Sequence, residues 1–83
     1  MTIKILKEND FYKTADLALA AVIFISYPLE SIDRQDRKAQ FLFKKDTGLD
    51  ELIANYWRGE LKVDPRRYFE ALRLIKARLY GEN

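Results

Sequence analysis

The side chains in this sequence that are best suited to chemistry are basic, and they gather near its C-terminal end. Between Lys62 and Tyr80 there are six Lys or Arg residues against two acidic ones, a local charge of +4, whereas the whole chain carries +2. Guanidinium and ammonium groups bind the phosphate oxygens of RNA and DNA. The candidate nucleic-acid-binding residues are Arg66, Arg67, Arg73, Lys76 and Arg78. A solvated helix face rich in Lys and Arg is the alternative interpretation.

Two of these arginines occupy an unusual place if the segment is helical. Arg66 and Arg67 directly follow Pro65, so they fall in the first helical turn, where the macrodipole disfavours positive charge. The backbone N–H groups at a helix start also bind anions. This placement favours a functional interpretation, in which the two arginines and the helix start hold a phosphate together.

The remaining reactive residues do not form a catalytic or metal-binding pattern. The sequence has neither His nor Cys, which removes the commonest general base, the thiolate nucleophile and the usual nitrogen and sulfur metal ligands. The adjacent Asp50 and Glu51 would point about 100° apart on a helix, and Asp33 and Asp36 flank a predicted turn. Either pair is a candidate for a hard cation, but helix capping and solubility explain both better. We therefore expect no enzyme activity, no metal and no cofactor.

Length and composition indicate a single small globular domain over residues 1–83. The chain is below the size at which domains split, and its 48% hydrophobic content is too high for a disordered segment. The absence of cysteine favours a cytoplasmic, reducing compartment. Residues 1–13 lack a signal-peptide pattern, and the longest apolar run, Leu17–Ile25, has about half the length that crosses a bilayer. We therefore expect a cytoplasmic protein with no membrane partner.

Hydrophobic periodicity predicts the elements that position the basic residues. Alternation over Thr2–Lys7 predicts a short N-terminal strand. The segment Ala15–Tyr27, with Thr14 as N-cap, predicts a helix that is apolar nearly all round and is therefore buried on more than one side. The segments Leu29–Arg34 and Lys38–Lys44 predict a β-hairpin.

A second helix is predicted over Leu49–Arg58. Asp46 or Thr47 precedes it as N-cap, and Gly59 follows it as a residue suited to the left-handed conformation that ends many helices. Its apolar residues recur at helical spacing and are expected to form one buried stripe. They are Leu49, Leu52, Ile53, Tyr56 and Trp57.

The last helix carries the basic residues. Asp64 as N-cap and Pro65 at the first helical position predict its start, and it is expected to run to about Leu79. The side chains expected to be buried are Tyr68, Phe69, Leu72, Ile75 and Leu79. Together the elements predict an α+β fold of order β-α-β-β-α-α, with a small antiparallel sheet, made of the N-terminal strand and the β-hairpin, and three helices packed on one face.

The aromatic residues are a second possible source of ligand contacts. Single-stranded bases stack on exposed rings, usually on a sheet. The outward face of the predicted hairpin carries Gln40, Leu42 and Lys44, whereas Phe41 and Phe43 face inward. Most rings are therefore expected to belong to the core. Those expected nearest the surface are Tyr12, Tyr27 and Tyr80.

Four stretches of the chain resemble a known family. They are the segment 11–21, the strand Phe41-Leu42-Phe43, the run 56–65 and the pattern over 72–80. The Tyr-Trp-x-Gly sequence at residues 56–59, followed by Val-Asp-Pro at 63–65, is the most specific part. Across residues 11–80 the chain resembles DUF5659, a small domain-of-unknown-function family of bacteria and their phages. The resemblance implies a compact domain in that setting, and it implies no activity, cofactor or site residue.

Two functional hypotheses follow, and both describe a binding protein. The first is a nucleic-acid-binding accessory protein that uses the five basic residues and loses affinity as salt rises. The second is a protein-interaction module, either a homodimer or a phage or mobile-element accessory protein. The strongly apolar first helix and an unpaired edge strand favour this second hypothesis. The charge distribution favours the first.

Overall fold

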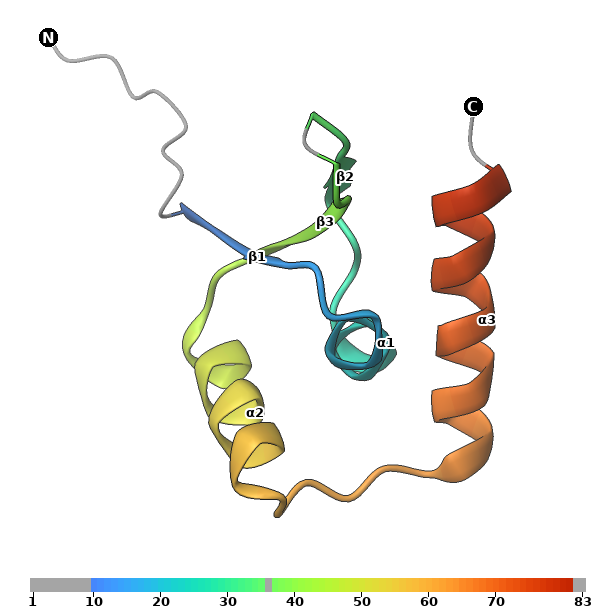
Figure 1. The fold of residues 1–83 in the computed structure, drawn as a ribbon. Helices are drawn as coiled ribbons and strands as arrows, with labels where there is room; N and C mark the ends of the chain where they lie inside the picture. The colour runs from blue at the N-terminus through green and yellow to red at the C-terminus, as the bar shows by residue number, and fades with distance from the viewer. Residues whose placement is uncertain (1–9, 36, 82–83) are drawn as a thin grey trace, which may run out of the picture.

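Three helices and a three-stranded antiparallel sheet make up the fold of residues 10–35 and 37–81, which the computed structural model describes (Figure 1). The predicted α+β class and the predicted order β-α-β-β-α-α are confirmed. The elements are β1 (Phe11–Thr14), α1 (Leu17–Ser26), β2 (Ser31–Asp33), β3 (Gln40–Lys44), α2 (Thr47–Arg58) and α3 (Pro65–Gly81).

The sheet has the strand order β1-β3-β2, so the second hairpin strand lies at its centre. Phe43 pairs with Tyr12 of β1, and Phe41 pairs with both Thr14 of β1 and Ile32 of β2. Phe41 and Phe43 are buried, which confirms the predicted inward face of β3. The first described strand lies at Phe11–Thr14, whereas the strand predicted over Thr2–Lys7 lies outside the described residues.

Helix α1 begins later than predicted, at Leu17 rather than Ala15, because Asp16 is its N-cap. The Asp16 Oδ1 atom accepts hydrogen bonds from the backbone N–H groups of Ala18 and Leu19 at 3.0 and 3.2 Å. The predicted cap, Thr14, instead ends β1, and its hydroxyl accepts a hydrogen bond from the Asp16 N–H at 3.0 Å. Thr14 belongs to β1 and lies two residues before the N-cap, Asp16. The prediction of Thr14 as N-cap was therefore wrong.

Helix α1 lies at the centre of the molecule, between α2 and α3 (Figure 1). Five consecutive residues, Leu19–Ile23, are buried, so the predicted burial on more than one side is confirmed. The core joins this helix to the inward face of the sheet and to one or more residues of each flanking helix. Its buried members are Leu19, Ala20, Ile23, Leu29, Phe41, Phe43, Leu49 and Ile75.

Helix α2 has the predicted caps, and of the predicted stripe Leu49 is buried while Leu52, Ile53 and Tyr56 are partly buried against the core. The Asp46 carboxylate accepts from the Leu49 N–H at 2.9 Å, and Gly59 has the left-handed φ of 74°. The prediction was wrong for Trp57, which is 63% exposed. Its ring meets the Tyr56 ring edge-on, with centroids 5.0 Å apart, so it packs on a neighbour at the surface rather than in the core.

Helix α3 begins as predicted, with the Asp64 Oδ2 atom accepting from the Arg67 N–H at 3.0 Å, and it continues to Gly81. Its buried residues are Ala71 and Ile75, and Phe69, predicted to be buried, is 68% exposed. The small Ala71 lets the backbones of α1 and α3 approach closely. Contact through Ala71 turns the helix so that Phe69 points away from α1.

Arg34 joins the hairpin to the end of α3. Its Nη1 and Nη2 atoms donate to the carbonyl oxygens of Leu79 and Arg78 at 3.0 and 3.1 Å. Carbonyls in the last helical turn lack intrahelical partners and carry the negative end of the macrodipole, so a guanidinium group there stabilises the helix. Arg34 thus caps α3 from a distant part of the chain.

We predict that Arg34→Ala lowers the free energy of unfolding by about 1 kcal/mol, because the last carbonyls of α3 lose their charged donor. Amide exchange in the last turn of α3 should also become faster. Urea denaturation and hydrogen exchange measure the two effects. Arg37→Ala, a change at another exposed arginine of the same loop, serves as the control, and equal effects of the two substitutions would contradict the capping role.

Candidate functional site

The five predicted nucleic-acid-binding residues are all exposed on α3, but they do not share one face of the helix. Successive helical residues turn by about 100°, so positions three and four apart lie side by side. On this basis Arg66, Arg73 and Lys76 lie on one side. Arg67 and Arg78 lie on another side, next to Ala71, which is buried against α1.

The side with three basic residues also carries two exposed aromatic rings. Phe69 is 68% exposed and Tyr80 is 75% exposed. Together the five residues follow one another at spacings of three, four, three and four, and we call them the outer stripe: Arg66, Phe69, Arg73, Lys76 and Tyr80. The rise of an α-helix makes the stripe about 21 Å long. Along it follow one cation, a ring, two cations and a second ring, on the side of α3 that faces away from the core.

The N-terminal half of the outer stripe borders a shallow hollow. Pro65, Arg66, Phe69, Glu70 and Arg73 line it. The Arg73 Nη2 atom lies 3.3 Å from a Glu70 carboxylate oxygen, and both side chains are well exposed. An exposed ion pair of this kind contributes little free energy, so Arg73 can exchange Glu70 for another anion at low cost.

The start of α3 differs from the expected phosphate site. The Asp64 carboxylate already accepts a hydrogen bond from the Arg67 N–H. The chain therefore supplies its own anion at the helix start, and the contribution of this terminus to binding an external phosphate is reduced. The arginine side chains themselves remain exposed.

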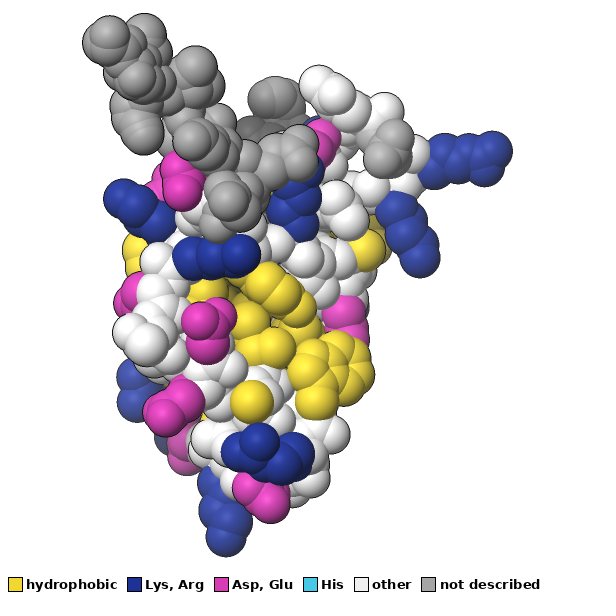
Figure 2. All heavy atoms as spheres, turned by 90° about the vertical axis from the view of Figure 1, so that its left-hand side faces the viewer, with side chains coloured by type: hydrophobic (Ala, Val, Ile, Leu, Met, Phe, Trp, Pro, Cys, Tyr) yellow, Lys and Arg dark blue, Asp and Glu magenta, His cyan; other side chains and the backbone are white. Residues whose placement is uncertain are grey.

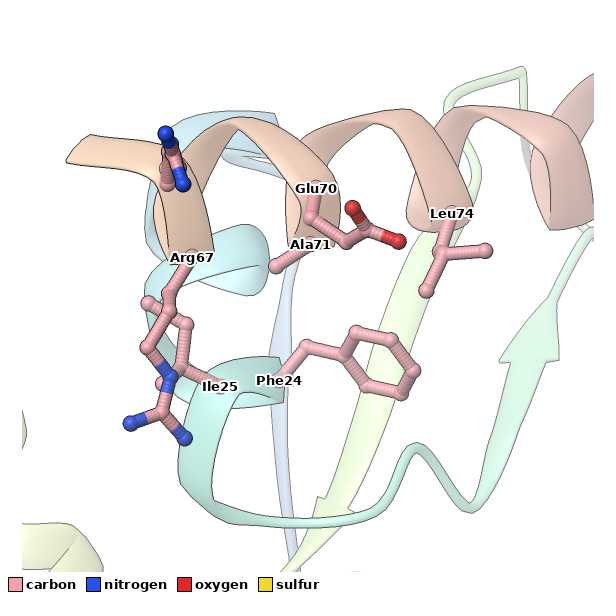
Figure 3. Close-up of a pocket in the computed structure, with 7 residues that line it drawn as sticks. Phe24, Ile25, Arg67, Glu70, Ala71 and Leu74 are labelled. Atoms are coloured by element: carbon pink, nitrogen blue, oxygen red, sulfur yellow. The ribbon is translucent and has the colours of Figure 1, made fainter. Parts of the chain in front are cut away.

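A groove runs between α1 and α3 on the side that carries Arg67 and Arg78. It consists of two hollows, of about 360 and 290 Å³, that share Phe24 and Leu74. Figure 3 shows the Phe24 side chain rising from α1 and Leu74 descending from α3 into the same space, while Arg67 reaches past Ile25. We call this feature the α1–α3 groove. Its lining residues are Phe24, Ile25, Arg66, Arg67, Glu70, Ala71, Leu74, Ala77, Arg78 and Gly81.

The Asp33 carboxylate contacts a backbone N–H group and an ammonium group. Asp33 accepts from the Gln35 N–H at 3.0 Å and lies 3.7 Å from the Lys13 ammonium group, and Asp36 lies outside the described residues. Across residues 10–35 and 37–81 there is no group of three His, Cys, Asp or Glu side chains that could hold a metal ion. None of the helices in that part of the chain is long and apolar enough to cross a membrane.

Sequence reasoning identified the cations but missed the residues between them. Phe69 was assigned to the core, and Phe24 and Leu74 were not considered as a surface. The three-four spacing of the outer stripe is visible in the sequence, but the seam of the same helix that contains the buried Ile75 has the same kind of spacing. The other members of that seam are partly buried: Tyr68, Leu72 and Leu79. Only the contact with α1 decides which seam is covered.

The fold and these surfaces define a small α+β domain with a cationic C-terminal helix. The chain belongs to the family described as Domain of unknown function (DUF5659), whose sequence model matches residues 9–81. This confirms the family that the sequence resembled. Neither the curated proteins nor the solved structures that were searched include a match. The bacterial or phage setting implied by the resemblance remains a prediction.

Adjacent residues of α3 should respond very differently to truncation. We predict that Ile75→Ala costs roughly 2–5 kcal/mol of unfolding free energy, because Ile75 is fully buried and leaves a cavity. Leu74→Ala should cost less than about 1 kcal/mol, because Leu74 is 43% exposed in the groove. Urea denaturation of the two variants measures the difference. Similar losses would mean that α3 is rotated from the orientation described.

Proposed function

We propose that the outer stripe of α3 binds single-stranded nucleic acid. The observation that carries the proposal is the exposure of Phe69 and Tyr80 in one line with Arg66, Arg73 and Lys76. Exposure of large aromatic rings to water is unfavourable, and a ligand that covers them is stabilised by the burial of their apolar surface. Cations and rings in one line supply the two contacts that single strands offer, phosphate and base face.

Single strands fit this surface better than duplexes. The bases of a duplex are stacked on one another, so their faces are closed to Phe69 and Tyr80, whereas bases of a single strand can unstack onto a protein ring. The stripe is also straight and about 21 Å long, which suits an extended strand. Base stacking of this kind is tolerant of sequence, so we infer weak sequence preference.

The electrostatic part of the binding has an expected size. Three cations on the stripe would neutralise about three phosphates and release their counterions, so log K should fall with log salt with a slope of about −2. Arg67 and Arg78, which lie along the α1–α3 groove, would add steering rather than direct contacts. Glu70 would be displaced from Arg73 by a phosphate.

A fluorescence-anisotropy titration with a labelled single-stranded oligonucleotide, at low and moderate salt, tests the proposal. Alanine at Arg66, Arg73 and Lys76 together should remove most of the affinity and flatten the salt slope. Phe69→Leu should weaken binding by roughly tenfold without changing the slope, because it removes a stacking surface but no charge.

The control removes the same number of exposed cations elsewhere. Its substitutions to alanine are at Lys38, Lys44 and Lys45. This variant should keep most of the affinity. Equal losses of affinity in the two triple variants would mean that net charge alone explains the binding. No binding by the native protein at low salt would refute the proposal.

A protein-interaction module, including a homodimer, is the second candidate. Figure 2 shows a patch of hydrophobic side chains on the side of the molecule that faces left in Figure 1, framed by charged residues. On α2, Trp57 is an exposed large hydrophobic residue of the kind that anchors interfaces.

This second candidate predicts self-association through the exposed tryptophan. Light scattering at increasing protein concentration should give the mass of a dimer, and Trp57→Ser should restore the monomer. A monomeric mass at all concentrations would exclude the homodimer.

A further inference from the structure

We propose that the α1–α3 groove binds an acidic amphipathic helix from a partner protein. The groove shares Arg66 with the outer stripe but otherwise lies on another side of α3, so the proposal goes beyond nucleic-acid binding. It rests on two properties of the groove: an apolar floor that no described part of the chain covers, and arginine side chains at both ends.

The floor of the groove is formed by the last turns of α1. Leu17–Ser26 contains no charged residue, and its middle, Leu19–Ile23, is buried. Phe24 and Ile25 are half-buried and line the groove from below. Leu74 overhangs them from α3 and is 43% exposed, and the buried Ala71 lines the same hollow. Apolar surface of this shape is stabilised when a partner covers it.

The ends of the groove are positively charged. Arg67 lines one hollow and Arg78 lines the other, and eleven residues of helix place them about 16 Å apart. Glu70 is the one acidic residue among the lining residues, and its carboxylate is paired with Arg73 at 3.3 Å. The groove therefore complements a ligand that is apolar in its middle and negative toward its ends.

A helix fits this groove better than a small molecule. The two hollows are open to solvent and join along the axis of α3, whereas pockets for small molecules enclose most of their ligand. The seam of α3 that borders the groove, Arg67, Ala71, Leu74 and Arg78, has spacings of four, three and four. Such a seam accepts the ridges of a second helix whose apolar residues recur every three or four positions.

A second copy of the chain is a poorer occupant. Helix α3 is cationic and would be repelled by the arginines at the groove ends. Helix α2 has acidic residues in its first two turns, Asp50 and Glu51, but its half-buried apolar residues Leu52, Ile53 and Tyr56 already pack against the core. A partner of different sequence is therefore required.

The test is a selection from a displayed library of helical peptides about five turns long, with the whole protein as bait. Enriched peptides should carry apolar residues at helical spacing flanked by Asp or Glu. Charge reversal at both ends of the groove, Arg67→Glu with Arg78→Glu, should weaken the best peptide by at least tenfold. Changing the acidic residues of that peptide to lysine should restore its affinity for the reversed variant.

Two controls make the result specific to the groove. Leu74→Lys should abolish peptide binding, whereas the charge reversals Lys76→Glu on the outer stripe and Lys44→Glu on β3 should leave it unchanged. Enriched peptides with no acidic bias, binding insensitive to Arg67 and Arg78, or no enrichment at all would overturn the proposal. A dimer that Leu74→Lys dissociates would identify a second copy as the occupant and would overturn it as well.

Discussion

The structure depends on the burial of α1. The segment Leu17–Ser26 has no charged side chain, so no side of the helix is suited to water. The inward face of the sheet covers it through Phe41 and Phe43, and α2 and α3 cover it from two sides. In a chain of 83 residues this one helix holds a large share of the apolar surface available for a core. The other elements bury the apolar surface of α1.

The surfaces that we assign to ligands follow from this constraint. Because α3 packs on α1 through Ala71 and Ile75, one seam of α3 is buried and two remain accessible. The first is the outer stripe, in which Phe69 and Tyr80 lie in one line with three cations. The second borders the α1–α3 groove, where the cover of α1 is incomplete. Arg34 fixes the far end of α3 and so helps to keep both seams in place. In our two proposals, one side of this helix binds nucleic acid and another side binds a protein.

The sequence was sufficient for the order of elements, because caps and periodicity are local properties. Asp46, Asp64 and Gly59 act as predicted, and Phe41 and Phe43 face inward. Where two residues compete for one role, local rules do not decide: Thr14 and Asp16 both suit an N-cap, and the pairing of β1 with β3 settled the choice. The candidate site was harder to predict from the sequence than the order of elements. All five basic residues were predicted and are exposed, yet their division between two sides, and the exposure of Phe69, depend on which seam of α3 meets α1.

The orientation of α3 on α1 is therefore the claim to test most directly. A soluble, inert gadolinium chelate broadens the NMR signals of side chains in proportion to their exposure to solvent. The account predicts strong broadening of the Phe69 and Tyr80 ring signals and almost none of the Ala71 and Ile75 methyl signals. Protection of Phe69, or broadening of Ile75, would contradict it, because α3 would then present a different seam to the core.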